Sequence, residues 1–245
     1  MADLEIERRP DRVVATLNRP AVRNAIDQAT IDALHALCAE LEAEPRILII
    51  TGSEGVFASG ADIAELRDRT AEDARAGINV NAFIRIHELR MPVIAAVDGW
   101  ALGGGAELAY AADLRIATPD ARFGNPETGL GIIAGAGATW RLKEIVGDAL
   151  ALELLLTGRI LTGGEALDAG LVSALHTSAD LLDAAHALAD RIAAQDPRAT
   201  QLTKSVFHAP RDQHPAVDIE AQAELFESPE KHRRMTEFLQ RRAKK

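Results

Sequence analysis

Short apolar runs alternate with helical apolar stripes along most of the chain. The apolar runs predict strands at residues 4–7, 13–17, 47–50, 93–97, 114–117 and 171–175. Apolar residues at helical spacing predict helices at residues 27–43, 72–89 and 104–112. The first two strands flank the turn sequence Arg9-Pro10-Asp11-Arg12 and should form a hairpin. Because parallel strands need crossover connections, the later alternation predicts an α/β fold built on a parallel sheet.

The pattern changes late in the chain, where only helices are expected after Ser178. We place a domain boundary at Asp196-Pro197, which separates a layered core at residues 1–196 from a helical region at residues 197–245. This region contains three further prolines and ends in a basic cluster. It fits two interpretations equally, a solvated helical tail or a docking and assembly element.

The composition is that of a globular protein with an acidic surface. Of the 245 residues, 47% are hydrophobic and 26% are charged, which argues against disorder. A formal charge of −10 disfavours nucleic acid and anionic lipid as partners. The N-terminus lacks the basic start and apolar run of a signal peptide, and the apolar run at residues 93–97 ends at Asp98, too soon to cross a bilayer. We therefore expect a soluble, cytoplasmic protein.

A glycine run connects a predicted strand to a predicted helix. Gly103-Gly104-Gly105 follows the strand at 93–97 and precedes Glu107 in the first turn of the helix. The first N–H groups of a helix lack internal partners and lie at the positive end of its dipole, so they can donate to a ligand oxygen. Glycine lets that oxygen approach the backbone closely. Three residues separate Gly104 from Glu107, so the carboxylate should lie on the same side as the Gly104 N–H.

A second strand, loop and helix start resemble the first. The strand at 47–50 leads to Gly60, Ala61 and Asp62, and Asp62 with Glu65 matches the pattern of a capping box. If the two strands are neighbours in a parallel sheet, both loops open at the same edge, where ligands bind in α/β proteins. Two backbone N–H groups would then form an oxyanion hole, in which loss of one donor costs about 3 to 4 kcal/mol of transition-state stabilisation.

Four segments in order resemble the motifs of the enoyl-CoA hydratase/isomerase, or crotonase, superfamily. They are Phe57-Ala58-Ser59-Gly60-Ala61-Asp62-Ile63, residues 98–108 around the glycine run, Phe123-Gly124-Asn125-Pro126-Glu127, and residues 135–142. Shorter matches at residues 18–25, 156–159 and 169–172 extend the resemblance over nearly the whole chain.

The resemblance implies a fold, a substrate and an assembly. The fold is a spiral of ββα turns followed by a helical C-terminal part that forms trimers, often paired into hexamers. The substrate is an acyl-CoA thioester, as in fatty acid metabolism such as β-oxidation, and CoA belongs to the substrate, so that neither a separate cofactor nor a metal is implied. Ala61 and Gly104 would bind the thioester oxygen through their N–H groups. The CoA part would contact six residues: Arg23, Ala25, Ala58, Gly60, Asp62 and Ile63.

The resemblance also assigns acid and base roles to Glu107 and Glu127, which match the two glutamates of family hydratases. Glu107 would help to deprotonate the water that adds to the β-carbon, and Glu127 would deliver a proton to the α-carbon. An apolar environment should raise the pKa of a glutamate toward working pH, whereas the helix dipole should favour ionised Glu107. The expected reaction is reversible hydration of a trans-2-enoyl-CoA to a 3-hydroxyacyl-CoA.

Two alternatives to the hydratase stay open, and a third, a nicotinamide enzyme, is disfavoured. A double-bond isomerase of the same superfamily would need Glu127 alone, and an acyl-CoA-binding protein without catalysis would need neither glutamate. The segment Gly129-Leu130-Gly131-Ile132-Ile133-Ala134 matches a dinucleotide fingerprint, but no buried strand precedes it, which argues against a nicotinamide enzyme. The seven histidines show no metal-ligand spacing.

Several residues depart from the common family pattern and leave the acyl group open. Trp140 stands where many members carry glutamine, Ala138 where glycine is usual, Ala134 where proline is frequent and Asp98 where asparagine is frequent. The first three cluster after Glu127, in a region that can shape the acyl pocket.

Overall fold

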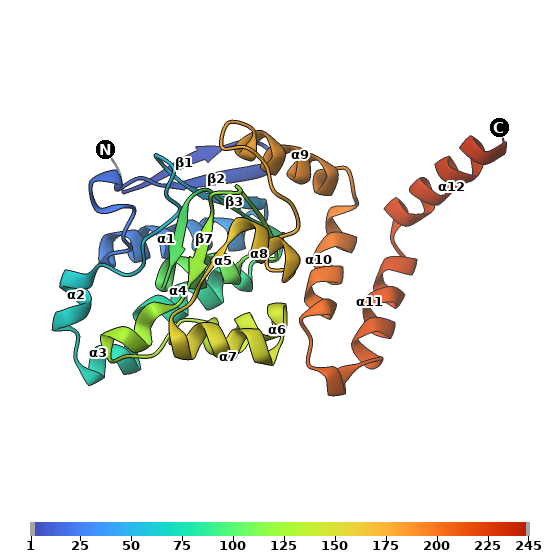
Figure 1. Ribbon diagram of the computed structural model, residues 1–245. Coiled ribbons are helices and arrows are strands. Elements are labelled where there is room, and N and C mark those ends of the chain that lie inside the picture. The colour runs from blue at the N-terminus through green and yellow to red at the C-terminus, as the bar shows by residue number, and fades with distance from the viewer. Residues whose placement is uncertain (1–2, 244–245) are drawn as a thin grey trace. The chain divides into compact units, whose positions relative to one another are not determined.

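The computed structural model describes residues 3–243 and divides the chain into two compact units, the first ending at Ala189 and the second beginning at Asp190. Figure 1 shows strands and helices in the first unit and helices alone in the second. The boundary lies within α9 (Leu181–Ala193), and the boundary suggested by the sequence coincides with the start of the next helix, which Asp196 caps.

A five-stranded sheet forms the centre of the first unit, in the order β1-β2-β3-β4-β6. Its strands are β1 (Leu4–Arg8), β2 (Arg12–Leu17), β3 (Ile47–Gly52), β4 (Val93–Val97) and β6 (Leu114–Ala117). The predicted hairpin is confirmed, because β1 and β2 pair antiparallel, and every later pair is parallel. All five residues of β4 are buried, as expected for a strand covered on both faces. The predicted α/β class is therefore confirmed.

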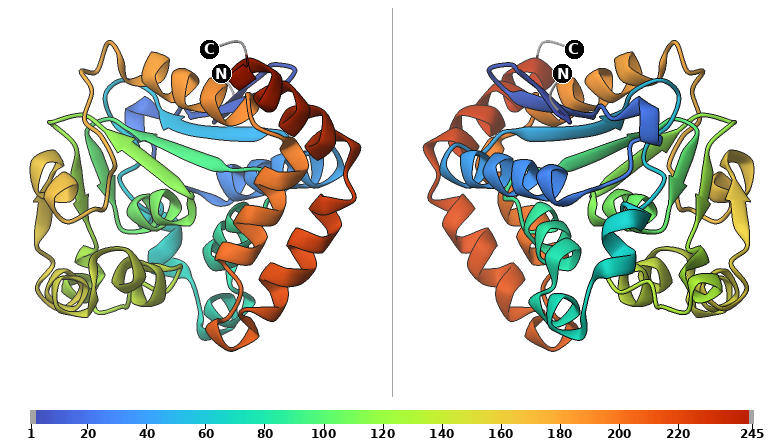
Figure 2. Two further views of the ribbon diagram at one scale, coloured as in Figure 1. Left: turned by 90° about the vertical axis from the view of Figure 1, so that its right-hand side faces the viewer. Right: turned by 90° about the vertical axis from the view of Figure 1, so that its left-hand side faces the viewer.

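Three helices pack in succession on one side of this sheet, as the views in Figures 1 and 2 show. They are α1 (Gln28–Ala43), α4 (Ile78–His87) and α5 (Gly104–Ala111). Helix α1 begins where predicted, because the Asp27 side chain accepts a hydrogen bond from the Thr30 N–H at 2.8 Å. Its buried stripe includes Leu34 and Cys38, so this cysteine is a core residue.

A second, smaller sheet was not predicted from the sequence. It contains β5 (Trp100–Leu102), β7 (Arg122–Gly124) and β8 (Ile160–Thr162), whose three-residue strands are too short for a recognisable alternation of polar and apolar residues. The strand predicted at 171–175 is wrong, because this segment contributes only a single bridge between Leu175 and Ala117. The helix predicted at 72–89 is also interrupted, at Gly77, whose φ of +67° is left-handed.

Short helices connect the larger elements of the first unit. The helices are α2 (Ile63–Asp68), α3 (Ala71–Ala76), α6 (Lys143–Val146), α7 (Asp148–Thr157) and α8 (Gly163–Asp168). Single 3-10 turns occur at η1 (Pro20–Val22) and η2 (Pro126–Leu130), and η3 (Ala138–Leu142) is a π-helical turn.

The second unit is helical, as predicted for the end of the chain. It contains α10 (Pro197–Phe207), the 3-10 turn η4 (Arg211–Gln213), α11 (Ala216–Phe226) and α12 (Pro229–Ala243). Arg198 on α10 forms an ion pair with Glu224 on α11 at 2.5 Å. Within residues 3–243, no helix is both long enough and apolar enough to span a bilayer.

Candidate active site

The glycine run adopts a conformation that brings a helix start next to a carboxyl group. Gly103 has φ +49° and ψ −125°, a backbone conformation open only to glycine, and α5 begins at the following residue. The Gly103 N–H donates to the Gly124 carbonyl at 2.8 Å. A Cβ on Gly103 would lie 3.1 Å from Glu127 Oε1. Glycine at this position therefore serves both the turn and the space for the carboxyl.

The second predicted loop lies beside the first. The Ala58 N–H donates to the Trp100 carbonyl at 2.9 Å, and the Leu102 N–H donates to the Ala58 carbonyl at 3.0 Å. A Cβ on Gly105 would meet the Ala58 carbonyl oxygen at 2.3 Å, so the two backbones touch where α5 starts. The expectation that both loops open at one edge is confirmed, because β3 and β4 are parallel neighbours.

The two predicted oxyanion donors lie close together. The Ala61 nitrogen is 3.5 Å from the position of a Cβ on Gly104, and the Gly104 nitrogen is 4.0 Å from that of a Cβ on Gly60. In the hydrogen-bond network of residues 3–243, neither the Ala61 N–H nor the Gly104 N–H donates to another backbone group. Both are thus available to a ligand oxygen.

Glu107 is buried on α5, with only 3% of its surface exposed. Its Oε1 accepts hydrogen bonds from the Ala136 N–H at 2.7 Å and the Ala138 N–H at 3.1 Å. Burial raises the pKa of Glu107 to about 7, and the negative charge of Glu127 acts in the same direction, against the backbone N–H groups of Ala138, Ala136 and Gly137. The rise of the Glu107 pKa expected from an apolar environment agrees with this value, and desolvation is its largest cause.

Glu127 lies in the 3-10 turn η2, directly after β7, and is 8% exposed. Burial raises its pKa above the ordinary value, opposed by the backbone N–H of Glu127 and by the side chain of Asn125. Its Oε1 accepts from Asn125 Nδ2 at 3.4 Å, whereas its Oε2 is buried and has no partner among residues 3–243. Two buried carboxyl groups with raised pKa values therefore lie near two free N–H groups.

The residues predicted to bind CoA come together from two segments. The Ser59 N–H donates to the Arg23 carbonyl at 3.0 Å, and the Ile26 N–H donates to the Gly60 carbonyl at 2.8 Å. The loop that contains Arg23 and Ala25 therefore lies against residues 58–62. Arg23 is exposed, and Ile63 is 59% exposed at the start of α2.

The capping box predicted at the start of α2 is wrong. Asp62 caps the helix by accepting from the Ala64 N–H at 3.0 Å, but Glu65 accepts from the Gln28 N–H at 3.0 Å instead of returning to Asp62. Asp62 also lies 3.5 Å from Arg19. Glu65 thus connects α2 to the start of α1.

The unusual segment after Glu127 holds Glu107 through its backbone. Ala136 and Ala138 donate to that carboxyl, a role that no side-chain motif signals. Trp140 is half-buried in the π-helical turn, with the Arg141 guanidinium 5.7 Å from its ring centre. Arg141 is 6% exposed, and its Nη1 has no hydrogen-bond partner in the described part of the chain.

Sequence reasoning missed two further residues of the site. Tyr110 is buried three residues after Glu107 on α5, and Asn125 is buried between Tyr110 and Glu127. Helical spacing from Glu107 could have indicated Tyr110. Asn125 stands within one of the four motifs that resemble the family, but nothing in the sequence indicated a separate role for it.

Comparison with known proteins identifies the family. The sequence model of the family described as enoyl-CoA hydratase/isomerase matches residues 12–245. The chain belongs to the enoyl-CoA hydratase/isomerase family. The resemblance inferred from the sequence motifs is therefore confirmed.

Members of the enoyl-CoA hydratase/isomerase family match this chain along almost all of its length. The short-chain-enoyl-CoA hydratase of Clostridium acetobutylicum is 37% identical, over 97% of this chain and 94% of its own. The 2,3-dehydroadipyl-CoA hydratase of Escherichia coli is 36% identical, over 99% and 97%. A solved structure, the enoyl-CoA hydratase from Bacillus anthracis, superposes with a TM-score of 0.92 at 30% identity and covers 98% of this chain and 96% of its own. The predicted crotonase-like fold is confirmed by this superposition.

Proposed function

We propose that this chain hydrates trans-2-enoyl-CoA thioesters to 3-hydroxyacyl-CoA thioesters, reversibly. One observation carries the proposal: Glu107 and Glu127 are both buried with raised pKa values beside the free N–H groups of Ala61 and Gly104. Its relatives named enoyl-CoA hydratases support the same reaction.

The two N–H groups bind the thioester oxygen in this proposal. As water adds to the β-carbon, negative charge moves through the conjugated system to that oxygen, and the N–H groups of Ala61 and Gly104 stabilise it. Fixed backbone donors need no reorganisation during the reaction. Because Gly60 and Gly104 carry no side chain, the substrate oxygen can come within hydrogen-bond distance of the backbone.

The two carboxyl groups exchange protons with water and with carbon. Glu107, ionised, takes a proton from the water as its oxygen bonds to the β-carbon, and Glu127, protonated, gives a proton to the α-carbon. A pKa of about 7 at Glu107 suits a group that changes protonation in every turnover near neutral pH. Both groups return to their starting states through exchange of one proton with solvent.

The CoA part lies along the two loops that join at Ile26 and Gly60 in this proposal. We propose that six residues line this path: Arg23, Ala25, Ala58, Gly60, Asp62 and Ile63. The exposed Arg23 offers a positive charge to phosphate on a chain whose net charge is −10. CoA is part of the substrate, and we propose no further cofactor.

Mixing the protein with crotonyl-CoA and following the loss of the conjugated thioester absorbance tests this function directly. We expect saturable hydration by the wild type. Glu127→Gln should abolish both hydration and the exchange of the α-proton for deuterium. Glu107→Gln should abolish hydration with less effect on that exchange. No hydration across short and long enoyl chains would refute the hydratase. Conversion of a 3-enoyl-CoA without hydration would identify an isomerase, and binding without either reaction an acyl-CoA-binding protein.

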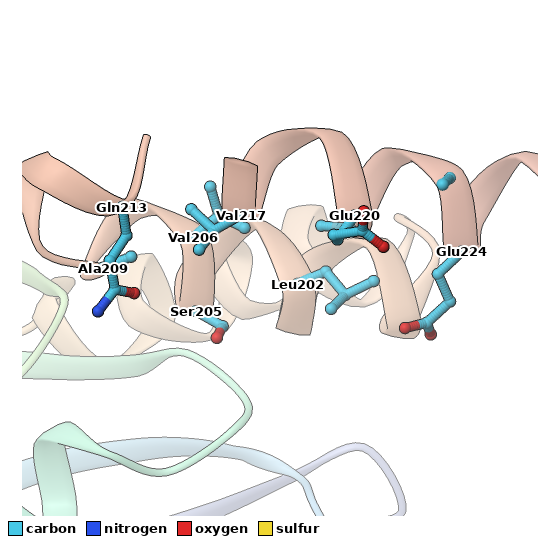
Figure 3. A pocket seen from close by; sticks show the side chains of 10 residues that line it. Leu202, Ser205, Val206, Ala209, Gln213, Val217, Glu220 and Glu224 are labelled. Atoms are coloured by element: carbon cyan, nitrogen blue, oxygen red, sulfur yellow. The ribbon is translucent and has the colours of Figure 1, made fainter. Parts of the chain in front are cut away.

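We also propose that the helical second unit joins copies of this chain into trimers or hexamers. Phe207 and Ile219 are 79% and 60% exposed, and α12 carries further exposed apolar residues, Met235, Phe238 and Leu239. A groove of about 580 Å³ runs between α10 and α11, with Leu202, Val206 and Val217 along it (Figure 3). Apolar surface of this extent supports burial against a second copy. A monomer in light scattering at micromolar concentration would refute the assembly.

The cytoplasmic location stays a prediction.

A further inference from the structure

A chain of buried hydrogen bonds leads from Tyr110 to Glu127. Tyr110 Oη donates to Asn125 Oδ1 at 3.2 Å, and Asn125 Nδ2 lies 3.4 Å from Glu127 Oε1 and 3.5 Å from the Gly103 carbonyl oxygen. Tyr110 is 2% exposed and Asn125 is 1% exposed. Buried polar groups of this kind impose one arrangement on each other, because an unmade hydrogen bond in the interior is costly.

The partners of Asn125 determine which way its amide points. The Gly103 carbonyl can only accept, so the amide must present its NH2 group on that side. The phenol of Tyr110 stays protonated, because burial raises its pKa, and it donates to the amide oxygen. A reversed amide would place its oxygen against two acceptors, the Gly103 carbonyl and Glu127 Oε1. The orientation is therefore fixed from both ends.

The fixed amide makes the two oxygens of Glu127 different. Oε1 faces an N–H of Asn125, and a proton on Oε1 would point at that hydrogen. Oε2 is buried, and no group of residues 3–243 donates to it or accepts from it. The proton that Glu127 exchanges is therefore carried by Oε2. Burial raises the Glu127 pKa, and the backbone N–H of Glu127 together with this N–H of Asn125 stabilises the ionised carboxylate and lowers it.

We propose that Asn125, held by Tyr110, is a positioning residue that turns Glu127 so that Oε2 alone exchanges a proton with the substrate. This inference rests on the proposed function, because it assumes that Glu127 is the acid that protonates the α-carbon. Tyr110 acts only through Asn125, because its hydroxyl contacts the amide and not the carboxyl.

The test uses Asn125→Leu, which keeps the approximate volume and removes the donor, with Asn125→Gln as the conservative variant. We expect kcat for crotonyl-CoA hydration to fall about tenfold or more in Asn125→Leu, with KM changed less than about twofold, because only transition-state geometry is lost. The basic limb of the kcat–pH profile, where Glu127 loses its proton, should move to higher pH. Asn125→Gln should recover part of both effects.

Tyr110→Phe tests the coupling between the two side chains. It should move the basic limb of the kcat–pH profile to higher pH, but by less than Asn125→Leu does. The double variant Tyr110→Phe/Asn125→Leu should have the same kcat and the same basic limb as Asn125→Leu alone. Thr118→Val is the matched control, because it also removes a buried hydroxyl group. The Thr118 hydroxyl donates to the Asp98 carboxylate at 2.9 Å. Thr118→Val should lower Tm and leave the pH profile unchanged.

The outcomes separate this inference from the proposed function. If the wild type hydrates crotonyl-CoA and Glu127→Gln does not, an unmoved basic limb in Asn125→Leu overturns the inference alone. If the wild type does not hydrate any enoyl-CoA, the carboxyl of Glu127 can still be titrated by carbon-13 NMR, its signal being identified by its absence in Glu127→Gln. Asn125→Leu should then raise its midpoint, and an unchanged midpoint overturns the inference.

Discussion

A methyl group added at Gly103 should damage catalysis more than it damages folding. In Gly103→Ala the new Cβ would lie 3.1 Å from Glu127 Oε1 and 3.6 Å from Glu127 Cδ, so the carboxyl must move by a few tenths of an ångström. The backbone at φ +49° and ψ −125° also becomes strained, at a cost of about 1 to 3 kcal/mol in stability. A displacement of 1 Å in a catalytic group costs roughly 100-fold in rate, so we expect kcat to fall about tenfold.

Gly147→Ala is the matched control for backbone strain. Gly147 has φ +83° and ψ 160°, equally restricted to glycine, but among residues 3–243 no heavy atom beyond its two chain neighbours lies within 4 Å of the position of its Cβ. Its variant should lose a similar free energy of unfolding, measured by urea denaturation, and keep the kcat of the wild type. Crotonyl-CoA hydration is assayed at a temperature where both variants are fully folded.

Two results for Gly103→Ala and its control Gly147→Ala would refute this reasoning. If Gly103→Ala and Gly147→Ala retain the same kcat, the contact between Gly103 and Glu127 does not control catalysis. If Gly103→Ala loses activity only at higher temperatures, where part of it is unfolded, the effect is one of stability and the reasoning from the 3.1 Å contact fails.

Three further predictions concern buried groups around α5. Because burial raises the pKa of Glu107 to about 7 from 4.5, the unfolded chain releases this proton first, and rising pH between those values costs the folded state about 3 kcal/mol. The Tm of Glu107→Gln minus the Tm of the wild type should therefore increase as the pH rises from 5 to 8. A difference that does not change with pH would contradict this prediction. Gly105→Ala should lower the free energy of unfolding, measured by urea denaturation, by about 1 to 3 kcal/mol, because its Cβ would lie 2.3 Å from the Ala58 carbonyl oxygen. An unchanged free energy of unfolding would show that the loops can separate. Arg141→Met should move the acid limb of the kcat–pH profile to higher pH, since it removes a buried positive charge whose field reaches Glu107, and a fixed limb would show that the charge is screened.

The sequence predicted the elements whose pattern extends over several turns or alternations. Helix α1 has its cap and its apolar stripe in the sequence, and β4 is a run of apolar residues followed by a glycine loop. The strands β5, β7 and β8 have three residues each, so they contain too little pattern to be recognised. Their formation depends on hydrogen bonds to partners far along the chain.

Some features of the candidate site could likewise be predicted from the sequence, and others could not. The motifs that resemble the family contain Ala61, Gly104, Glu107 and Glu127, and the resemblance implies a role for each of them. The sequence predicted that an apolar environment would raise the pKa of the glutamates, but it could not say by how much. The helix dipole, a local effect, suggested an ionised Glu107, whereas burial by residues from several elements raises its pKa to about 7.

What the sequence determined by itself was therefore the family and the order of the main elements, and it named the two carboxyl groups of the candidate site. Those features depend on residues near each other in the chain. The tertiary structure decided which backbone groups hold Glu107, which amide orients Glu127, and how far each carboxyl is removed from water. Segments distant in sequence supply these contacts, because desolvation and hydrogen bonding in the interior depend on what surrounds a group in space.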